Sequence, residues 1–335
     1  MPLPSILGRT VLYIAAGALA LNGAYHLART YCGGEPGAPS PVPEYPLYDT
    51  MLVFGDSITH MGGNPSVSGY VLHLSNRFAR RLDVLNRGFS GYNTRDALNV
   101  ADRVFPKTTA SSPISRWTKP DQAIFGSSKQ ATTLWTGFPG QPKSPRICLL
   151  FFGANDARLS PFPQHVPLAE FYNNTRQLVG LLRDPESEYY SPKTRILMIT
   201  PPPTGDRMVE EICRRGGYPT DRKNAVTKEY AEAVATIAGE FGLPHVDLWA
   251  AIEGLVHSGD AFVPLEDPII LGSEKMDHVA REDTATHPGE ADSTGSPYEG
   301  YERFLVDGLH LNSQGNEVLF KLIVEAIKEA WPDMD

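Results

Sequence analysis

MLVFGDSIT, residues 51–59, joins a short apolar run to a turn that carries a serine. The first four residues are all apolar, a pattern typical of a strand that is buried on both faces of a parallel sheet. Gly55 and Asp56 end the run, and Ser57 follows where such a strand meets the next element. Open α/β folds bind ligands at the carboxyl edge of the sheet, so this stretch predicts both a fold and the position of a reactive hydroxyl.

Four further short runs, rich in Val, Ile, Leu and Phe, follow along the chain at 83–86, 147–152, 195–200 and 244–248. Apolar residues recur at helical spacing in three of the intervening or following segments, 71–82, 168–182 and 318–327. Strands that alternate with helices in this way form a parallel sheet with both faces covered. The sequence therefore predicts a three-layer α/β/α sandwich with a central parallel sheet of about five strands, of the flavodoxin-like type.

The composition fits one folded domain and excludes some partners. At 335 residues the chain has the length of a single α/β domain with insertions. With a formal charge of −9 it lacks the clustered Lys and Arg that a nucleic-acid surface needs. The three cysteines, Cys32, Cys148 and Cys213, have no metal-site spacing and are too few for a disulfide framework. Cys148 lies inside an apolar run and is expected to be a buried thiol.

The chain is expected to have three parts, which are a targeting or membrane-anchor segment (1–30), a linker rich in Pro and Gly (31–46) and the folded domain (47–335). An uncharged apolar run occupies residues 11–21. A cleaved secretory signal peptide, an uncleaved anchor over residues 10–28 and a mitochondrial presequence all fit this run. We expect membrane anchoring or entry into the secretory pathway, with the mitochondrial presequence as the alternative.

Two long stretches interrupt the α/β rhythm. Residues 107–145 are rich in Ser, Thr, Pro and Gly, and residues 273–300 mix charge with Gly, Ser and Pro. Loops of this length are uncommon in compact domains. We expect 273–300 to be a disordered surface insertion. For 107–145 a disordered insertion and a lid over an apolar pocket both stay open, because the stretch carries aromatic residues such as Trp117 and Trp135.

The far end of the chain supplies the partners that a reactive serine needs. A serine hydroxyl becomes a good nucleophile only when a neighbouring base takes its proton. Asp307 and His310 lie three residues apart, which places them together on a helical turn or in a tight loop. Ser57 as nucleophile, His310 as base and Asp307 as the orienting acid complete the set for serine acyl transfer. A helix cap is the alternative role for Ser57, and the two roles are compatible.

Two further motifs lie between these ends, Arg87-Gly88-Phe89-Ser90-Gly91 and Gly153-Ala154-Asn155-Asp156, each after a predicted strand. Together with Gly55-Asp56-Ser57-Ile58 and Asp307-Gly308-Leu309-His310, they resemble the four ordered blocks of the GDSL, or SGNH, hydrolases. The resemblance covers about residues 48–330. Within that superfamily the blocks are most similar to the isoamyl acetate-hydrolysing esterase group, from which the two long insertions depart.

The resemblance implies an oxyanion hole. Its donors would be the backbone amides of Ser57 and Gly91 and the side-chain amide of Asn155, which bind the negatively charged oxygen of the transition state. Asp56 and Asp156 are expected to be hydrogen-bond partners that hold these loops, and not reacting groups. His60 follows the nucleophile turn and is a candidate for lining the pocket.

The expected function is that of a serine esterase. It would cleave small carboxylic esters with short, acetate-type acyl groups through an acyl-enzyme, and it would need no metal and no cofactor. The sequence has no Gly-x-Ser-x-Gly, phosphate-loop, dinucleotide or His-Glu-x-x-His motif, which argues against those classes. One alternative is a lipase or lysophospholipase that acts on membrane lipids, favoured by the apolar N-terminal segment. The other is a catalytically silent, membrane-tethered binding protein, which the intact blocks disfavour.

Overall fold

The computed structural model describes residues 48–107, 144–258 and 298–334. The predicted targeting segment and linker lie outside the described residues, as do almost all of the first insertion, for which a lid and disorder were both open, and almost all of the second. None of the helices in the described ranges combines the length and apolar character that crossing a bilayer requires.

A parallel sheet of five strands runs in the order β2-β1-β3-β4-β5. Its strands are β1 (Asp49–Gly55), β2 (Leu82–Gly88), β3 (Ile147–Phe151), β4 (Arg195–Ile199) and β5 (His245–Val246). The register pairs Gly55 with both Gly88 and Phe151, so β1, β2 and β3 end side by side. The strand order reverses at β1, because the chain goes first to β2 on one side and then to β3 on the other. The predicted parallel sheet and its number of strands are confirmed.

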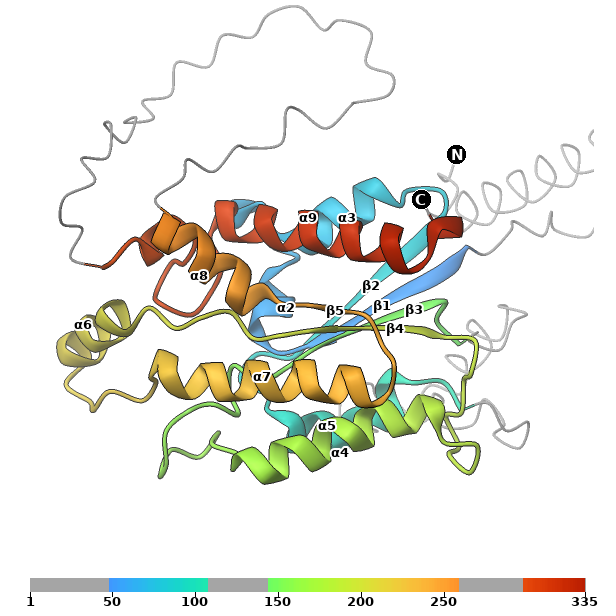
Figure 1. The fold of residues 1–335 in the computed structure, drawn as a ribbon, viewed down its shortest axis with the longest axis horizontal. Coiled ribbons are helices and arrows are strands. Elements are labelled where there is room, and N and C mark those ends of the chain that lie inside the picture. The colour runs from blue at the N-terminus through green and yellow to red at the C-terminus, as the bar shows by residue number, and fades with distance from the viewer. Residues whose placement is uncertain (1–47, 108–143, 259–297, 335) are drawn as a thin grey trace, which may run out of the picture. The chain divides into compact units, whose positions relative to one another are not determined.

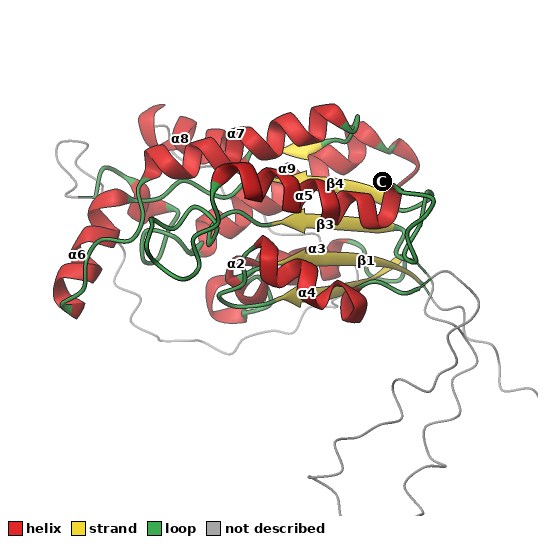
Figure 2. Ribbon diagram, turned by 90° about the horizontal axis from the view of Figure 1, so that it is seen from below, coloured by secondary structure: helices red, strands yellow, loops and turns green. Residues whose placement is uncertain are grey.

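Helices cover both faces of the sheet. Figure 1 shows α3, α8 and α9 on one face and α4, α5 and α7 on the other. In Figure 2, β1, β3 and β4 lie side by side among the helices that cover them. This is the predicted three-layer α/β/α sandwich. The helical elements are α2 (Ser57–Met61), η1 (Pro65–Val67), α3 (Tyr70–Arg77), α4 (Thr94–Val104), α5 (Leu168–Arg183), α6 (Asp206–Gly216), α7 (Asn224–Glu240), α8 (Leu248–Ser258), η3 (Tyr301–Arg303), α9 (Ser313–Ala330) and η4 (Pro332–Met334).

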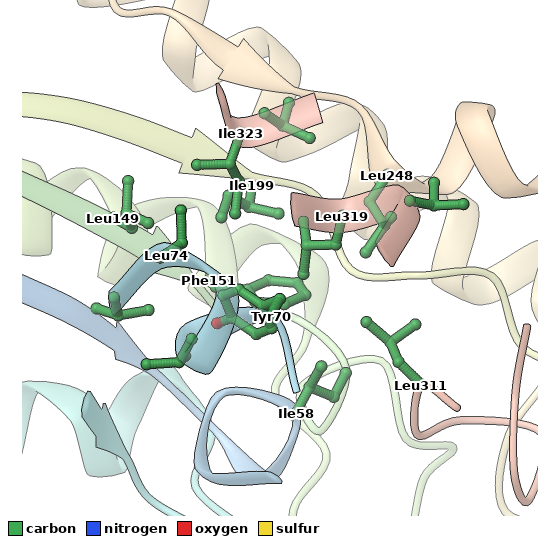
Figure 3. Close-up of a cluster of buried hydrophobic side chains, with 14 of the residues drawn as sticks. Ile58, Tyr70, Leu74, Leu149, Phe151, Ile199, Leu248, Leu311, Leu319 and Ile323 are labelled. Carbon is green, nitrogen blue, oxygen red and sulfur yellow. The ribbon is translucent and has the colours of Figure 1, made fainter. Parts of the chain in front are cut away.

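Each face of the sheet has its own apolar core, because successive strand residues point to opposite faces. Leu149 and Ile199 lie on the face covered by α3, α8 and α9, where they join Leu319 of α9 (Figure 3). Phe54 and Leu150 lie on the other face, in the core formed with α4, α5 and α7. Burial of both faces explains why residues 51–54 of β1 and the whole of β3 are continuous apolar runs and not alternating ones.

One predicted helix is shorter than its apolar spacing indicated. The segment 71–82 was expected to be helical throughout, but α3 ends at Arg77 and Leu82 is the first residue of β2. Arg80 has a φ of 65°, in the left-handed region, which a right-handed helix cannot accommodate. Cys148, expected to be a buried thiol, lies in β3 with no exposed surface, and burial raises its pKa.

Candidate active site

Ser57, His310 and Asp307 form a continuous hydrogen-bonded chain. His310 Nε2 lies 2.9 Å from Ser57 Oγ, and His310 Nδ1 lies 2.7 Å from Asp307 Oδ2. An ionised carboxylate only accepts hydrogen bonds, so the ring nitrogen that faces Asp307 donates. The other ring nitrogen is then the acceptor for the Ser57 hydroxyl, which is the arrangement a general base needs. The structure thus brings together the three residues at the two ends of the predicted domain.

The turn between β1 and α2 positions Ser57. At Gly55 an added Cβ would lie 2.6 Å from the carbonyl oxygen of Phe151, so no larger residue fits without a backbone shift. Asp56 caps α2 by accepting a hydrogen bond from the Ile58 N–H at 2.9 Å. Ser57 is therefore the first residue of α2 and not its cap, and its hydroxyl points to the imidazole instead.

Asp56 is a buried carboxyl below this turn, with 1% of its surface exposed. Burial raises its pKa to about 6, and the Ile58 N–H together with the electrostatic effects of His310 and the Arg222 guanidinium limits the rise. Its hydrogen bond to the Ile58 N–H holds the backbone of the turn and does not involve the reacting hydroxyl.

Asp307 and His310 lie in a tight loop and not on a helical turn. Asp307 Oδ1 accepts hydrogen bonds from the N–H groups of Leu309 at 3.0 Å and His310 at 2.8 Å. Gly308 has a φ of 84°, and its carbonyl oxygen accepts from the Gly205 N–H at 2.9 Å. Burial raises the pKa of Asp307, but the hydrogen bond and charge of His310 and the two N–H groups outweigh it and hold the pKa below its ordinary value. Asp307 is therefore ionised at neutral pH.

The other two predicted oxyanion donors follow the neighbouring strands β2 and β3. Gly91 has a φ of 83°, and its carbonyl oxygen accepts from Gln164 Nε2 at 2.8 Å. Asn155 is buried, and its Nδ2 donates to the carbonyl oxygen of Tyr92 at 2.9 Å, which ties the two loops together. An amide nitrogen has two N–H groups, so Asn155 keeps a second donor. Ser57, Gly91 and Asn155 thus lie beyond the carboxyl ends of three adjacent strands.

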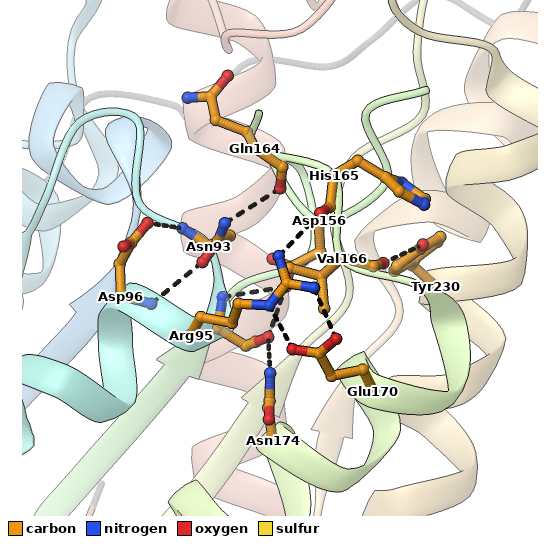
Figure 4. Close-up of polar contacts among 11 residues, drawn as sticks. Asn93, Arg95, Asp96, Asp156, Gln164, His165, Val166, Glu170, Asn174 and Tyr230 are labelled. Atoms are coloured by element: carbon orange, nitrogen blue, oxygen red, sulfur yellow. Dashed lines mark hydrogen bonds and ion pairs between the residues drawn. The ribbon is translucent and has the colours of Figure 1, made fainter. Parts of the chain in front are cut away.

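Asp156 joins the loop after β3 to the start of α4 (Figure 4). Its Oδ1 accepts hydrogen bonds from the Thr94 N–H at 2.9 Å and the Thr94 hydroxyl at 2.5 Å. Asn174 Nδ2 donates to the same hydroxyl oxygen at 3.2 Å. Oδ2 of Asp156 is buried and has no hydrogen-bond partner among the described residues. Burial raises the pKa of Asp156 to about 7, against the two hydrogen bonds from Thr94, which lower it.

A sequence profile of the GDSL-like lipase/acylhydrolase family matches residues 53–318, which include the Ser57 turn and the loop of Asp307 and His310. The chain belongs to this family. It is therefore a carboxylic ester hydrolase.

Known relatives of this GDSL-like hydrolase carry esterase names. The isoamyl acetate-hydrolyzing esterase 1 homolog of Mus musculus is 30% identical over 276 residues, which are 82% of this chain and 79% of that protein. A GDSL esterase/lipase of Arabidopsis thaliana is 30% identical over 286 residues, which are 83% of this chain and 86% of that protein. The solved lipase/acylhydrolase from Enterococcus faecalis is 21% identical, covers 84% of this chain and 96% of its own, and superposes with a TM-score of 0.46. The resemblance inferred from the four sequence blocks is confirmed by the two sequence relatives.

The site of this hydrolase also contains a residue that sequence reasoning missed. Arg222 lies in the segment between α6 and α7 and is 8% exposed. Its guanidinium donates hydrogen bonds to the carbonyl oxygen of Ala154 and, at 3.1 Å, to Oδ1 of Asn155. No motif marks Arg222, because it follows Asp221 in a short polar segment whose composition is typical of a surface loop. Only the folded chain brings it to the end of β3.

An open hollow of about 280 Å³ adjoins the second block. It is lined by Ser90, Gly91, Tyr92, Asp96, Asn99 and Val100. His60, the candidate pocket residue, is exposed, and its Nδ1 lies 2.7 Å from Ser90 Oγ. His60 therefore contacts one of the residues that line the hollow but does not itself line it, and it is not part of the hydrogen-bonded triad of Ser57, His310 and Asp307. Across the described ranges, no group of His, Cys, Asp and Glu side chains has the arrangement of a metal site.

Proposed function

We propose that this chain hydrolyses small carboxylic esters through an acyl-enzyme on Ser57. The hydrogen-bonded chain from Ser57 through His310 to Asp307, with distances of 2.9 and 2.7 Å, carries the proposal. It supplies a nucleophile, a base and the acid that orients the base, within hydrogen-bond reach of one another.

The first half-reaction forms the acyl-enzyme. His310 Nε2 takes the proton of the Ser57 hydroxyl as Oγ attacks the ester carbonyl carbon, and Asp307 stabilises the imidazolium that results. The negative charge moves to the former carbonyl oxygen, where the N–H groups of Ser57 and Gly91 and the Asn155 amide are the proposed donors. His310 then gives its proton to the leaving alkoxide, and the alcohol departs. Water repeats the sequence on the acyl-enzyme, which releases the acid and restores Ser57.

The proposed substrate is an ester with a short, acetate-type acyl group. The name of the mouse relative, an isoamyl acetate-hydrolyzing esterase homolog, supports this choice. An open hollow of about 280 Å³ lies beside Gly91, one of the proposed oxyanion donors, and is a place where part of a small ester could bind.

Hydrolysis of a chromogenic ester series, from acetyl to palmitoyl, by the full chain tests the proposal. Ser57→Ala and His310→Ala are measured beside the wild type. Ser68→Ala is the matched control, because Ser68 Oγ also bonds a histidine, His73 Nε2 at 2.8 Å, outside the proposed site.

The proposal predicts activity that peaks at short acyl chains, is lost in Ser57→Ala and His310→Ala, and persists in Ser68→Ala. A maximum at palmitoyl would move the function to lipids. Full activity in Ser57→Ala, or no hydrolysis of any ester by the wild type, would contradict the proposed chemistry.

A further inference from the structure

Arg222 is a buried cation beside one of the proposed oxyanion donors. Both of its hydrogen bonds in the structure go to uncharged oxygens, the carbonyl oxygen of Ala154 and Oδ1 of Asn155. The neighbouring Asp221 instead pairs with Arg158, whose Nε lies 2.6 Å from Asp221 Oδ2. Among the described residues, Arg222 forms no ion pair of its own.

The guanidinium remains charged in this position. Burial lowers the pKa of Arg222, and the nearby charges of Asp221, Asp56 and Asp307 oppose that effect. Arginine begins from a pKa above about 12, so it keeps its proton at neutral pH. Buried charges are costly unless they are paired, and a buried guanidinium bonded only to carbonyl oxygens therefore needs a reason.

The contact with Arg222 determines how the Asn155 amide is oriented. A guanidinium has only donors, so it holds the amide oxygen, Oδ1, toward itself. Nδ2 then lies on the opposite side, where it donates to the carbonyl oxygen of Tyr92 at 2.9 Å. If the amide flipped, its NH₂ group would face the guanidinium donors and its oxygen would face a carbonyl oxygen. The contacts of Asn155 with Arg222 and with the Tyr92 carbonyl oxygen therefore both disfavour the flipped amide. As a result, the second N–H of Asn155 has a fixed direction.

We propose that Arg222 is a positioning residue of the oxyanion hole, which fixes Asn155 as a donor and places a positive charge behind it. A negative charge that develops on the substrate oxygen is stabilised by the aligned N–H and by the guanidinium field in a site of low dielectric constant. This inference rests on the proposed function. It adds a residue that none of the four sequence blocks contains.

If Arg222 had a purely structural role, its substitution would have different effects on the kinetics and the stability. An arginine that only ties the segment between α6 and α7 to β3 would change stability and substrate binding without acting through Asn155. Arg183 provides the matched control, because it is a half-buried arginine that, like Arg222, donates to two uncharged oxygens, here the backbone carbonyl oxygens of Ser191 and Pro192. Arg183 lies at the end of α5, near the start of β4 and thus at the opposite edge of the sheet.

The test is a double-mutant cycle on the full chain, with the ester that the wild type cleaves best. The variants are Arg222→Gln, Arg222→Lys, Asn155→Ala, the double variants that combine each Arg222 substitution with Asn155→Ala, and Arg183→Gln. The measurements are kcat, KM and the temperature of thermal unfolding. Arg222→Lys retains the positive charge but lacks the planar set of guanidinium donors. It therefore separates the electrostatic effect of the charge from the orientation of the Asn155 amide.

We expect Arg222→Gln to lower kcat by about ten- to a hundredfold with little change in KM, which is less than the two to three decades expected for removal of the donor itself. Arg222→Lys should recover part of that loss, and Arg183→Gln should leave kcat unchanged. In the Asn155→Ala background, Arg222→Gln should cost less than in the wild type, because the orientation of Asn155 is already lost and only the field of the guanidinium is removed. Arg222→Lys, which keeps the charge, should cost less than about threefold in that background.

Equal losses from Arg222→Gln in the wild-type and Asn155→Ala backgrounds, or a change confined to KM, would overturn the inference while the proposed function stands. If Arg222→Gln does not fold, Arg222→Lys carries the same comparison. Absence of ester hydrolysis by the wild type would overturn the proposed function and this inference with it.

Discussion

The change Asp307→Asn makes a specific prediction about the tautomer of His310. In the wild type, Asp307 Oδ1 accepts two backbone N–H groups at 3.0 and 2.8 Å, and Oδ2 lies 2.7 Å from His310 Nδ1. An asparagine at this position keeps the two backbone bonds only if its oxygen occupies the Oδ1 position. Its NH₂ group then takes the place of Oδ2 and donates to Nδ1, which must become the acceptor.

The consequence falls on Ser57. With Nδ1 as acceptor, the ring proton of neutral His310 moves to Nε2, 2.9 Å from Ser57 Oγ, and that nitrogen can no longer take the serine proton. Loss of the correct tautomer in a serine triad costs on the order of 10⁴ in kcat. This corresponds to about 5.5 kcal/mol of activation free energy. The opposite amide orientation would restore the tautomer but would sacrifice the two backbone hydrogen bonds.

The assay is steady-state hydrolysis of a short-chain chromogenic ester at pH 7 to 8, with thermal unfolding of the same variant as the control for folding. We expect kcat to fall by about four decades while the fold is retained. A loss of less than about tenfold in a folded variant would refute the assignment of Asp307 as the orienting acid.

Three further predictions concern the loops around the site. Asn155→Ala should lower kcat by about two to three decades with KM nearly unchanged, because it removes a transition-state donor; a loss that appears only in KM would speak against the oxyanion role. Gly308→Ala should lower the unfolding temperature, because its Cβ would lie 2.8 Å from the Gly205 carbonyl oxygen at a φ of 84°. The control is Gly239→Ala, at a helical position with open space around it, and equal unfolding temperatures would count against the steric argument. Asp156→Asn should reduce a pH-dependent loss of stability, because a carboxyl with a pKa of about 7 in the folded chain binds its proton more tightly than one with the ordinary pKa of 3.8. Asp156 alone should lower wild-type stability by up to about 4 kcal/mol as the pH rises from about 4 to 8, while Asp56, with its pKa of about 6, contributes equally in both proteins; urea unfolding curves that depend equally on pH in both proteins would disprove this.

The sheet was predictable because a strand that is buried on both faces is a short, continuous apolar run in the sequence. Residues 51–54 of β1 and all of β3 are apolar, since alternate residues enter the two cores. The end of α3 was not predictable from spacing, because Phe78 and Leu82 are apolar whether the chain is helical or turns into β2. The left-handed backbone at Arg80, in the turn between α3 and β2, leaves no compositional signal of its own.

The part of the candidate site that lies in short sequence motifs could be predicted from the sequence. The Ser57 turn and the loop with Asp307 and His310 were marked by sequence, and the structure places their side chains within hydrogen-bond distance. Arg222 was not marked, because a buried arginine is recognised only by the oxygens around it, which other segments supply. The roles of Gly91 and Asn155 as donors stay predictions.

The central claim is that Ser57 is an activated nucleophile, and labelling by a fluorophosphonate tests this claim directly. Such a probe phosphonylates a serine whose proton is removed by a neighbouring base, with fluoride as the leaving group. Intact-mass measurement and peptide mapping of the full chain should show one adduct, on Ser57. Labelling should be absent in Ser57→Ala and strongly slowed in His310→Ala. An unlabelled wild type, or an adduct of equal extent in Ser57→Ala, would contradict the account.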